Sequence, residues 1–216
     1  MITAERKSKE KGERRKIILD AALKLFSSKG YENVTMDDVA RETGLAKGTL
    51  YLYFKNKETL YVAAVIPGIT IFGEMVEQAM AAEKRGISKV YAGGLAYYEF
   101  SKKYPVYFDM MLDAQKRWFS GDLGEAIRTE FATQKFHTWL ISVDAIRMGI
   151  SDGTIRKDAD PNMTATFLIE TTTAMIRASL ESHVRRGGSL TTRDELVYFT
   201  LDMLGHAIEN KGDHRW

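Results

Sequence analysis

The 216-residue sequence contains no cysteine and only three prolines. Without cysteine the chain cannot form disulfides, use a thiol nucleophile or bind a metal through thiolates. This absence fits a reducing compartment, and we expect a cytoplasmic protein. The seventeen glycines and few prolines also exclude low-complexity sequence, so the composition predicts a compact globular chain.

Long hydrophobic runs are missing as well. The longest uncharged apolar stretch, residues 60–73, contains Pro67-Gly68 and is shorter than the roughly 18 to 20 residues of a membrane-spanning helix. The apolar residues that follow the basic N-terminus are interrupted by Asp20 and Lys24, which argues against a signal peptide. We therefore expect that the first residues are not removed as a signal peptide and that the protein has no membrane partner.

The chain has almost no overall excess of one charge sign, since the net charge is +2. The charges are nevertheless unevenly distributed along it. Residues 1–60 carry 13 Lys and Arg against 9 Asp and Glu, a net charge of +4, whereas the remainder carries 18 against 20, a net charge of −2. Two interpretations stay open on charge alone: a polyanionic partner, or a solvated tail that happens to be basic.

Apolar residues recur at spacings of three and four, and alternating β-branched runs are absent. The sequence therefore predicts an all-α fold of about nine helices. Glycines, prolines and capping residues set their limits. The expected ranges are 14–29, 35–43, 47–54, 56–80, 88–103, 105–119, 123–151, 161–186 and 191–210. Residues 1–12 are predicted to be a disordered basic tail.

Residues 35–54 have the pattern of a helix-turn-helix. Two short crossing helices need a small residue at their contact and a left-handed residue at the turn, and Ala40 and Gly44 meet these needs. Leu50 and Phe54 lie four residues apart and are expected in the core. Lys47, Tyr51 and Lys55 then share an open face that fits a DNA major groove. A lysine in the first helical turn opposes the helix dipole, which favours a binding role over that of an ordinary surface lysine.

Residues 14–62 resemble the DNA-binding region of the TetR family of transcriptional regulators. The residues that carry the resemblance are Leu25-Phe26-Ser27-Ser28-Lys29-Gly30-Tyr31, Thr35, Val39-Ala40, Gly44 and the run from Lys47 to Leu60. One departure is Ala46, where many members place a Ser or Thr that caps the recognition helix. The resemblance implies a helix-turn-helix domain over residues 13–60 and a ligand-binding and dimerisation domain over residues 61–216.

The resemblance also implies roles for individual residues. Residues expected to approach base edges are Lys47, Gly48, Thr49 and Tyr51, and residues expected to contact phosphates are Thr35, Tyr53 and Lys57. For Tyr51 and Tyr53, packing in the core is an alternative, which we expect to hold in part for Tyr53. Since family members act as dimers, we expect a double-stranded, near-palindromic DNA operator.

Beyond residue 65 the resemblance implies an architecture and leaves the ligand open. Aromatic and methionine side chains suit a hydrophobic or aromatic effector. Candidate pocket residues are Phe72, Tyr97, Phe100, Met111, Trp118, Trp139, Glu170 and Thr173. Glu170 could anchor a cationic or hydroxylated ligand, or simply be exposed. Candidate homodimer-interface residues, which could equally belong to the core, are Leu168, Met175, Ser179, Leu196, Phe199 and Met203.

Signals for an enzyme are weak. Residues 149–153 match the letters of a hydrolase nucleophile motif, but a predicted helix precedes Ser151 where that motif needs a strand. The four histidines lack metal-ligand spacing, and we expect no cofactor, metal or catalytic residue. The sequence favours a homodimeric repressor released from DNA by a small molecule. Alternatives are an activator, a ligand-independent regulator, a helical enzyme, or a membrane-surface binder using residues 6–29.

Overall fold

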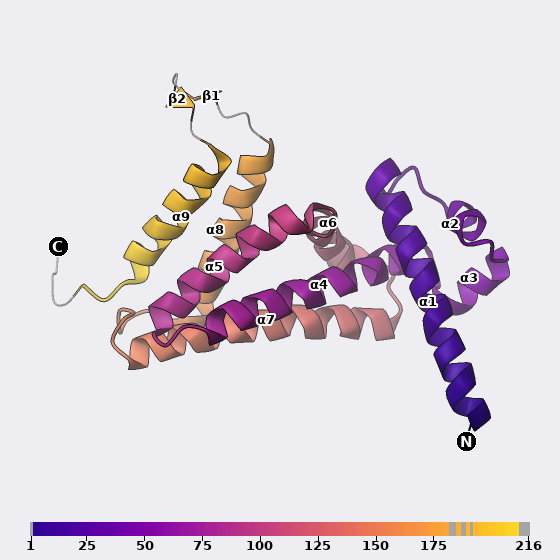
Figure 1. The fold of residues 1–216 in the computed structure, drawn as a ribbon, viewed down its shortest axis with the longest axis horizontal. Helices are drawn as coiled ribbons and strands as arrows, with labels where there is room; N and C mark the ends of the chain where they lie inside the picture. The colour runs from indigo at the N-terminus through magenta and orange to yellow at the C-terminus, as the bar shows by residue number, and fades with distance from the viewer. Residues whose placement is uncertain (1, 182–184, 187–188, 191, 212–216) are drawn as a thin grey trace. The chain divides into compact units, whose positions relative to one another are not determined.

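A computed structural model describes residues 2–181, 185–186, 189–190 and 192–211, which form nine helices (Figure 1). The helices are α1 (Ile2–Lys29), α2 (Met36–Thr43), α3 (Lys47–Tyr53), α4 (Lys57–Ala81), α5 (Gly86–Lys103), α6 (Pro105–Ser120), α7 (Glu125–Ser151), α8 (Pro161–Glu181) and α9 (Arg193–Ile208). Two short strands, β1 (Arg185–Arg186) and β2 (Ser189–Leu190), pair antiparallel between α8 and α9. The predicted all-α fold is confirmed.

Two helix limits differ from the expectation by more than two residues. The structure extends α1 back to Ile2, through the segment predicted to be a disordered tail. Lysine, arginine and glutamate have high helix propensity, and Arg6 pairs with Glu10 one turn later at 3.2 Å, so charge alone was a poor indicator of disorder. The helix expected over residues 161–186 is described as α8 up to Glu181, and Arg185 and Arg186 belong to strand β1 instead.

The chain divides into two compact units. Unit 1 comprises Met1–Thr70 and Val106–Gln134, and unit 2 comprises Ile71–Pro105 and Lys135–Trp216. The unit that contains the helix-turn-helix therefore extends beyond the domain limit expected at residue 60. It does so because buried side chains of α6 and α7, among them Met110, Ala114 and Phe131, complete the core around α1 to α4.

The first part of α4 is the centre of the unit 1 core. Leu60, Val62, Ala63 and Val65 are fully buried, together with Ile18 of α1. By length and composition α4 could cross a membrane, but 67 % of its most apolar window is buried inside the protein. Its apolar character is thus explained by packing between helices of the same chain.

Unit 2 joins α5, α8 and α9 with the second parts of α4 and α7. The start of α5 approaches α7 so closely that a Cβ atom on Gly86 would lie 2.0 Å from the backbone nitrogen of Gly149. Asp152 accepts a 2.7 Å hydrogen bond from the Gly86 amide, which holds the two backbones together. Only a residue without a side chain fits at this contact.

Gly86→Ala should destabilise the protein by about 1–3 kcal/mol, because backbone atoms of α7 cannot move aside for the new methyl group. Thermal unfolding of the purified variant measures the effect. Gly205→Ala is the matched control, since a Cβ atom at this helical glycine would meet open space. A melting temperature of Gly86→Ala equal to that of the wild type would contradict the close approach.

Candidate nucleic-acid interface

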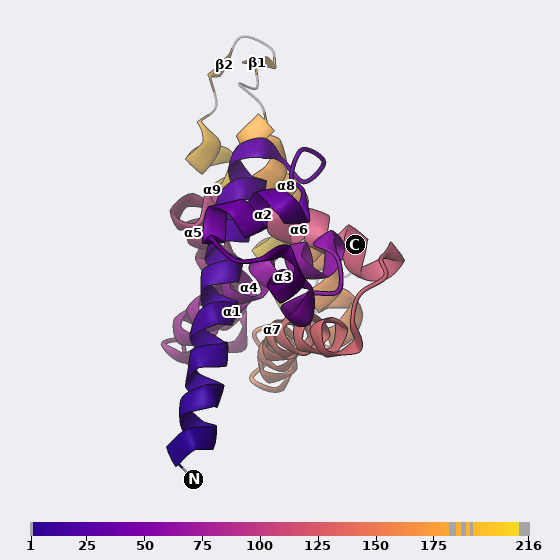
Figure 2. The ribbon, with the colours of Figure 1, turned by 90° about the vertical axis from the view of Figure 1, so that its right-hand side faces the viewer.

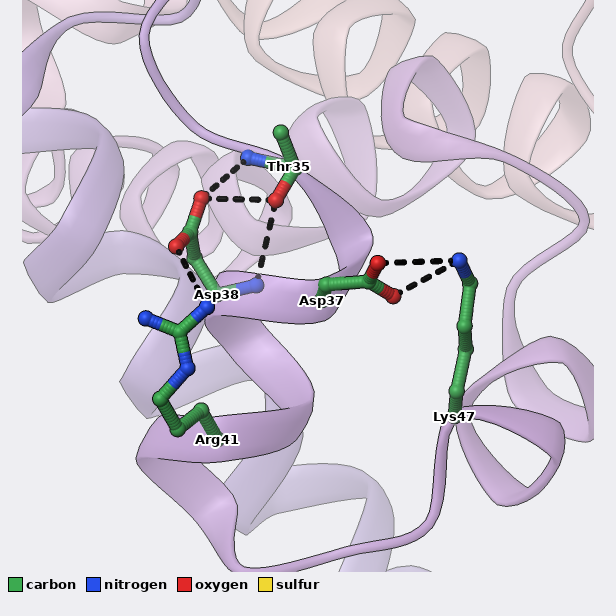
Figure 3. A network of polar contacts seen from close by, with 5 residues as sticks. All are labelled: Thr35, Asp37, Asp38, Arg41 and Lys47. Carbon is green, nitrogen blue, oxygen red and sulfur yellow. Dashed lines mark hydrogen bonds and ion pairs between the residues drawn. The ribbon is translucent and has the colours of Figure 1, made fainter.

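The helix α2 begins with a complete capping box (Figure 3). The Thr35 hydroxyl accepts a hydrogen bond from the Asp38 amide at 3.2 Å, and the Asp38 carboxylate accepts bonds from the Thr35 amide at 2.9 Å and its hydroxyl at 2.6 Å. These bonds, the hydroxyl bond first, lower the pKa of Asp38. Thr35, expected at a phosphate, therefore also defines the start of α2.

The turn between α2 and α3 depends on Gly44, which has a left-handed backbone with φ of 67°. The next helix starts at Ala46, which provides no side-chain hydrogen bond to the first amides of α3. Both features were predicted from the sequence. The first turn of α3 consequently has free backbone donors that water or a bound phosphate can satisfy.

The two sides of α3 have opposite character. Leu50 and Phe54, the C-cap residue, are buried in the unit 1 core, as predicted. Lys47 and Tyr51 are exposed on the other side, and a Cβ atom at Gly48 would meet nothing within 4 Å. This arrangement leaves an open surface next to a backbone that a partner can approach closely.

Leu52 is a further exposed residue of α3 that the sequence reasoning did not select. Its exposed fraction is 83 %, the largest among the exposed large hydrophobic residues described. The spacing could have revealed it, because Leu52 lies only two positions after Leu50 and cannot share its buried face. An exposed leucine in this position can contact the methyl group of a thymine base.

Asp37 of α2 holds the ammonium group of Lys47 (Figure 3). Lys47 Nζ lies 2.7 Å from one carboxylate oxygen and 3.0 Å from the other. The hydrogen bond to Asp37 raises the pKa of Lys47. The carboxylate offsets the unfavourable position of a cation at a helix N-terminus and fixes the direction in which the lysine points.

Two other expected DNA-contact residues, Lys57 and Tyr53, pack against neighbouring residues within unit 1. Lys57 Nζ donates to the backbone oxygen of Tyr31 at 2.9 Å and lies 4.2 Å from the centre of its ring. Tyr53 is half-buried against the core, as the packing alternative predicted. A phosphate contact by Lys57 would require its ammonium group to leave Tyr31.

The loop between α6 and α7 contacts the α3–α4 junction. Asp122 pairs with Lys55 at 2.7 Å, its backbone oxygen accepts from the Asn56 side chain at 3.0 Å, and its amide donates to Glu58 at 3.3 Å. Asn56 in turn accepts from the Thr59 amide at 2.8 Å and so caps α4. No spacing in the sequence could have predicted this contact, because 66 positions separate Asn56 and Asp122.

The candidate effector residues are divided between the two units, and two of the eight belong to unit 1. Met111 and Trp118 pack against the unit 1 core. The Trp118 indole donates to the Arg128 backbone at 3.2 Å, and Arg128 donates back to the Trp118 oxygen at 2.8 Å. These two residues stabilise the contact between α6 and α7.

In unit 2, Phe72 contacts two of the other aromatic candidates, Tyr97 and Phe100. Its ring centre lies 4.6 Å from that of Tyr97 and 5.2 Å from that of Phe100. The Thr173 hydroxyl donates to the Tyr97 oxygen at 3.0 Å, and burial raises the pKa of Tyr97 to about 12. The cluster therefore combines three aromatic rings, of which Tyr97 and Phe100 are buried, with one polar pair.

The other two candidates in unit 2 lie at its surface. Glu170 is exposed, in line with one of the two interpretations left open by the sequence, and Trp139 is half-buried with its indole 3.4 Å from the Thr166 hydroxyl. Burial lowers the pKa of Lys135, and the charge of Glu170 opposes this shift. Among the described residues no three His, Asp or Glu side chains could hold a metal ion.

The candidate interface residues on α8 and α9 differ in exposure. Phe199 and Met203 have exposed fractions of 63 % and 54 %. Leu168, Met175 and Leu196 are half-buried, and Ser179 is buried, donating to the Ile176 oxygen at 2.7 Å. The sequence missed four other exposed apolar residues on these helices, namely Met163, Phe167, Leu180 and Tyr198.

Asp38→Asn should lower the melting temperature at neutral pH, because the charged carboxylate accepts two bonds from Thr35. Since folding lowers the pKa of Asp38, its stabilising effect is present above the ordinary carboxyl pKa and is lost as the pH falls through the lowered value. Thermal unfolding of both proteins from neutral to acidic pH measures this. A melting-temperature difference that persists unchanged in acid would contradict the role of the charge.

Comparison with known proteins shows which regulators this chain is similar to. Residues 18–64 match the model of "Bacterial regulatory proteins, tetR family". The uncharacterized HTH-type transcriptional regulator YhgD of Bacillus subtilis is 29 % identical over 166 residues, covering 76 % of this chain and 83 % of the relative. The HTH-type transcriptional repressor KstR2 of Mycolicibacterium smegmatis is 23 % identical over 200 residues and covers 93 % of each chain.

A solved structure shares the overall fold. The transcriptional regulator FadR from Bacillus subtilis, in complex with stearoyl-CoA, superposes with a TM-score of 0.69 at 19 % identity over 89 % of this chain and 98 % of the other. The likeness thus includes both the helix-turn-helix and the helices that follow it. The matched helix-turn-helix and the relatives along most of the chain support a TetR-like DNA-binding transcriptional regulator.

Proposed function

We propose that the protein is a cytoplasmic, homodimeric repressor that a small-molecule effector releases from a near-palindromic operator. The observation that carries the DNA-binding part is the exposed surface of α3, whose opposite side is buried by Leu50 and Phe54. Repression is supported by the names of relatives such as KstR2 of Mycolicibacterium smegmatis.

In this proposal α3 reads bases in the major groove. The Lys47 ammonium can donate to guanine O6 and N7, the Thr49 hydroxyl can donate or accept, and Gly48 allows the backbone to come close. Tyr51 and Leu52 add contacts to thymine methyl groups. Thr35, Tyr53 and Lys57 hold phosphates on either side and set the orientation of α3.

The homodimer in this proposal forms through α8 and α9. Large apolar side chains with more than a third of their surface exposed are found on both helices. They are Met163, Phe167, Leu180, Tyr198, Phe199 and Met203. An exposed apolar surface of this kind favours association with a second copy of the chain. The two recognition helices would then lie one duplex turn apart, about 34–36 Å, or a multiple of it.

The proposed effector is a hydrophobic or aromatic small molecule that binds in unit 2. The cluster of Phe72, Tyr97 and Phe100 supplies aromatic rings, and the Tyr97–Thr173 pair supplies a polar anchor. The structural relative FadR carries stearoyl-CoA, a long apolar chain with a polar end. Ligands of this class are therefore the first to test for release of DNA.

Lys47→Ala and Tyr51→Ala should each weaken binding to the operator by about 5- to 150-fold, the effect of losing one base contact. Selection from a random duplex library first yields the operator, and titration of labelled DNA then measures the dissociation constants. Tyr91→Ala is the matched control, because Tyr91 is an exposed tyrosine of unit 2 with a similar exposed fraction, 39 % against 46 % for Tyr51. Selection of no common sequence, or equal affinities for all three variants, would overturn the proposed role of α3.

The double variant Phe199→Glu, Met203→Glu should convert the dimer into monomers, because two charges would replace apolar side chains in the interface. Analytical ultracentrifugation measures the mass, and operator binding should weaken in parallel. Met148→Glu, which places a charge at a 39 % exposed residue of α7, is the control. If the double variant remains a dimer, α8 and α9 do not form the interface.

A further inference from the structure

The first three turns of α1 extend as a charged rod beyond the helices of the helix-turn-helix (Figure 2). All residues from 5 to 14 are exposed. Up to Lys16 the chain carries seven Lys and Arg against three Glu, a net charge of +4. This part of α1 therefore contributes no core packing and needs another explanation.

The charges on this segment are unevenly distributed around the helix. Lys7, Lys11 and Arg14 follow one another at spacings of four and three, so they lie on one face, which continues into the buried Ile18. We name these three residues the basic stripe. Glu5 and Glu13 lie on other faces of the helix.

The cations of the basic stripe are available to a partner. Glu10, which flanks the stripe, is paired with Arg6 at 3.2 Å. In the described part of the chain, no salt bridge involves Lys7, Lys11 or Arg14. These cations differ in this respect from Lys47 and Lys55 near α3, both of which are held by carboxylates.

The basic stripe leads away from the end of the recognition helix. The next residue, Arg15, lies 5.7 Å from the ring centre of Phe54, the C-cap residue of α3, and pairs with Glu130 at 3.3 Å. From Lys7 to Arg14 the stripe is about 10 Å long at the helical rise of 1.5 Å per residue. That length corresponds to roughly three base-pair steps of a duplex.

We propose that Lys7, Lys11 and Arg14 bind backbone phosphates of the DNA that flanks the operator, without reading its sequence. This inference rests on the proposed function, because the operator must first place a duplex against α3. Binding by the stripe releases counterions from the flanking DNA and thereby increases affinity and its dependence on salt.

The composition of the segment selects DNA over a membrane surface as the partner. Between Glu5 and Lys16 there is no apolar side chain. A helix that binds at a membrane interface needs a wide apolar face to bury among the lipids. A polyanion requires only the cations that the stripe provides.

The test compares Lys7→Gln, Lys11→Gln, Arg14→Gln with the wild type on an operator with long flanks. Loss of three phosphate contacts should reduce the slope of log affinity against log salt by about 2.7, since each contact contributes roughly 0.9. The wild type should therefore lose about 40-fold more affinity than the variant between roughly 50 and 200 mM salt. On an operator trimmed to the helix-turn-helix footprint the two proteins should bind alike.

The matched control, Arg6→Gln, Lys9→Gln, Lys16→Gln, removes the same charge from other faces of α1 and should keep most of the slope. Equal losses for both triple variants would overturn the stripe as a site and leave only the overall charge of α1. An unchanged slope for the stripe variant, with operator binding still weakened by Tyr51→Ala, would overturn the inference but not the proposed function. If no duplex is bound specifically even by the wild type, both fail.

A vesicle-binding experiment completes the test. Vesicles of phosphatidylcholine mixed with phosphatidylglycerol are incubated with the wild type and the stripe variant, and bound protein is measured by sedimentation. We expect no stripe-dependent binding. Retention of the wild type but not of the stripe variant, together with an unchanged DNA salt slope, would replace DNA by an anionic lipid surface as the partner.

Discussion

The burial of Leu50 and Phe54 is the interaction on which the exposed side of α3, the proposed DNA interface, depends. The helix α3 has seven residues and begins at Ala46 without a side-chain cap, so it is too short and too poorly capped to be stable alone. Its conformation is maintained by packing of these two residues in a core that α1, α4, α6 and α7 complete. The position of the exposed side of α3 is therefore set by the core beneath it.

The α6–α7 loop also supports α3, because it contacts the junction between α3 and α4. Asp122 contacts Lys55, Asn56 and Glu58, which connect α3 to α4. Arg117 of α6 lies 3.3 Å from the centre of the Tyr31 ring, on which Lys57 also rests. The orientation of the α3–α4 junction is thus set by residues more than fifty positions away in the chain.

The cations of unit 1 fall into two groups with different consequences for DNA. Lys47, Lys55 and Lys57 have partners within the protein, so a phosphate or base must compete with Asp37, Asp122 or Tyr31 for them. Competition of this kind lowers the affinity for any duplex. Affinity is gained only where the contact with DNA is more favourable than the contact within the protein that it replaces. The basic stripe of α1 has no such competition among the described residues and suits binding that is independent of sequence.

The sequence by itself determined the helices, the helix-turn-helix and its buried and exposed sides, because these depend on local periodicity, capping and a left-handed glycine. It could not show that α1 continues to Ile2, since composition is ambiguous between a solvated helix and a disordered tail. Only the tertiary structure decided that Asp37 holds Lys47, that Asp122 contacts the start of α4, and that Met111 and Trp118 pack in unit 1 while Phe72 and Tyr97 pack in unit 2. These contacts join residues far apart in the chain, and no local pattern specifies such pairs.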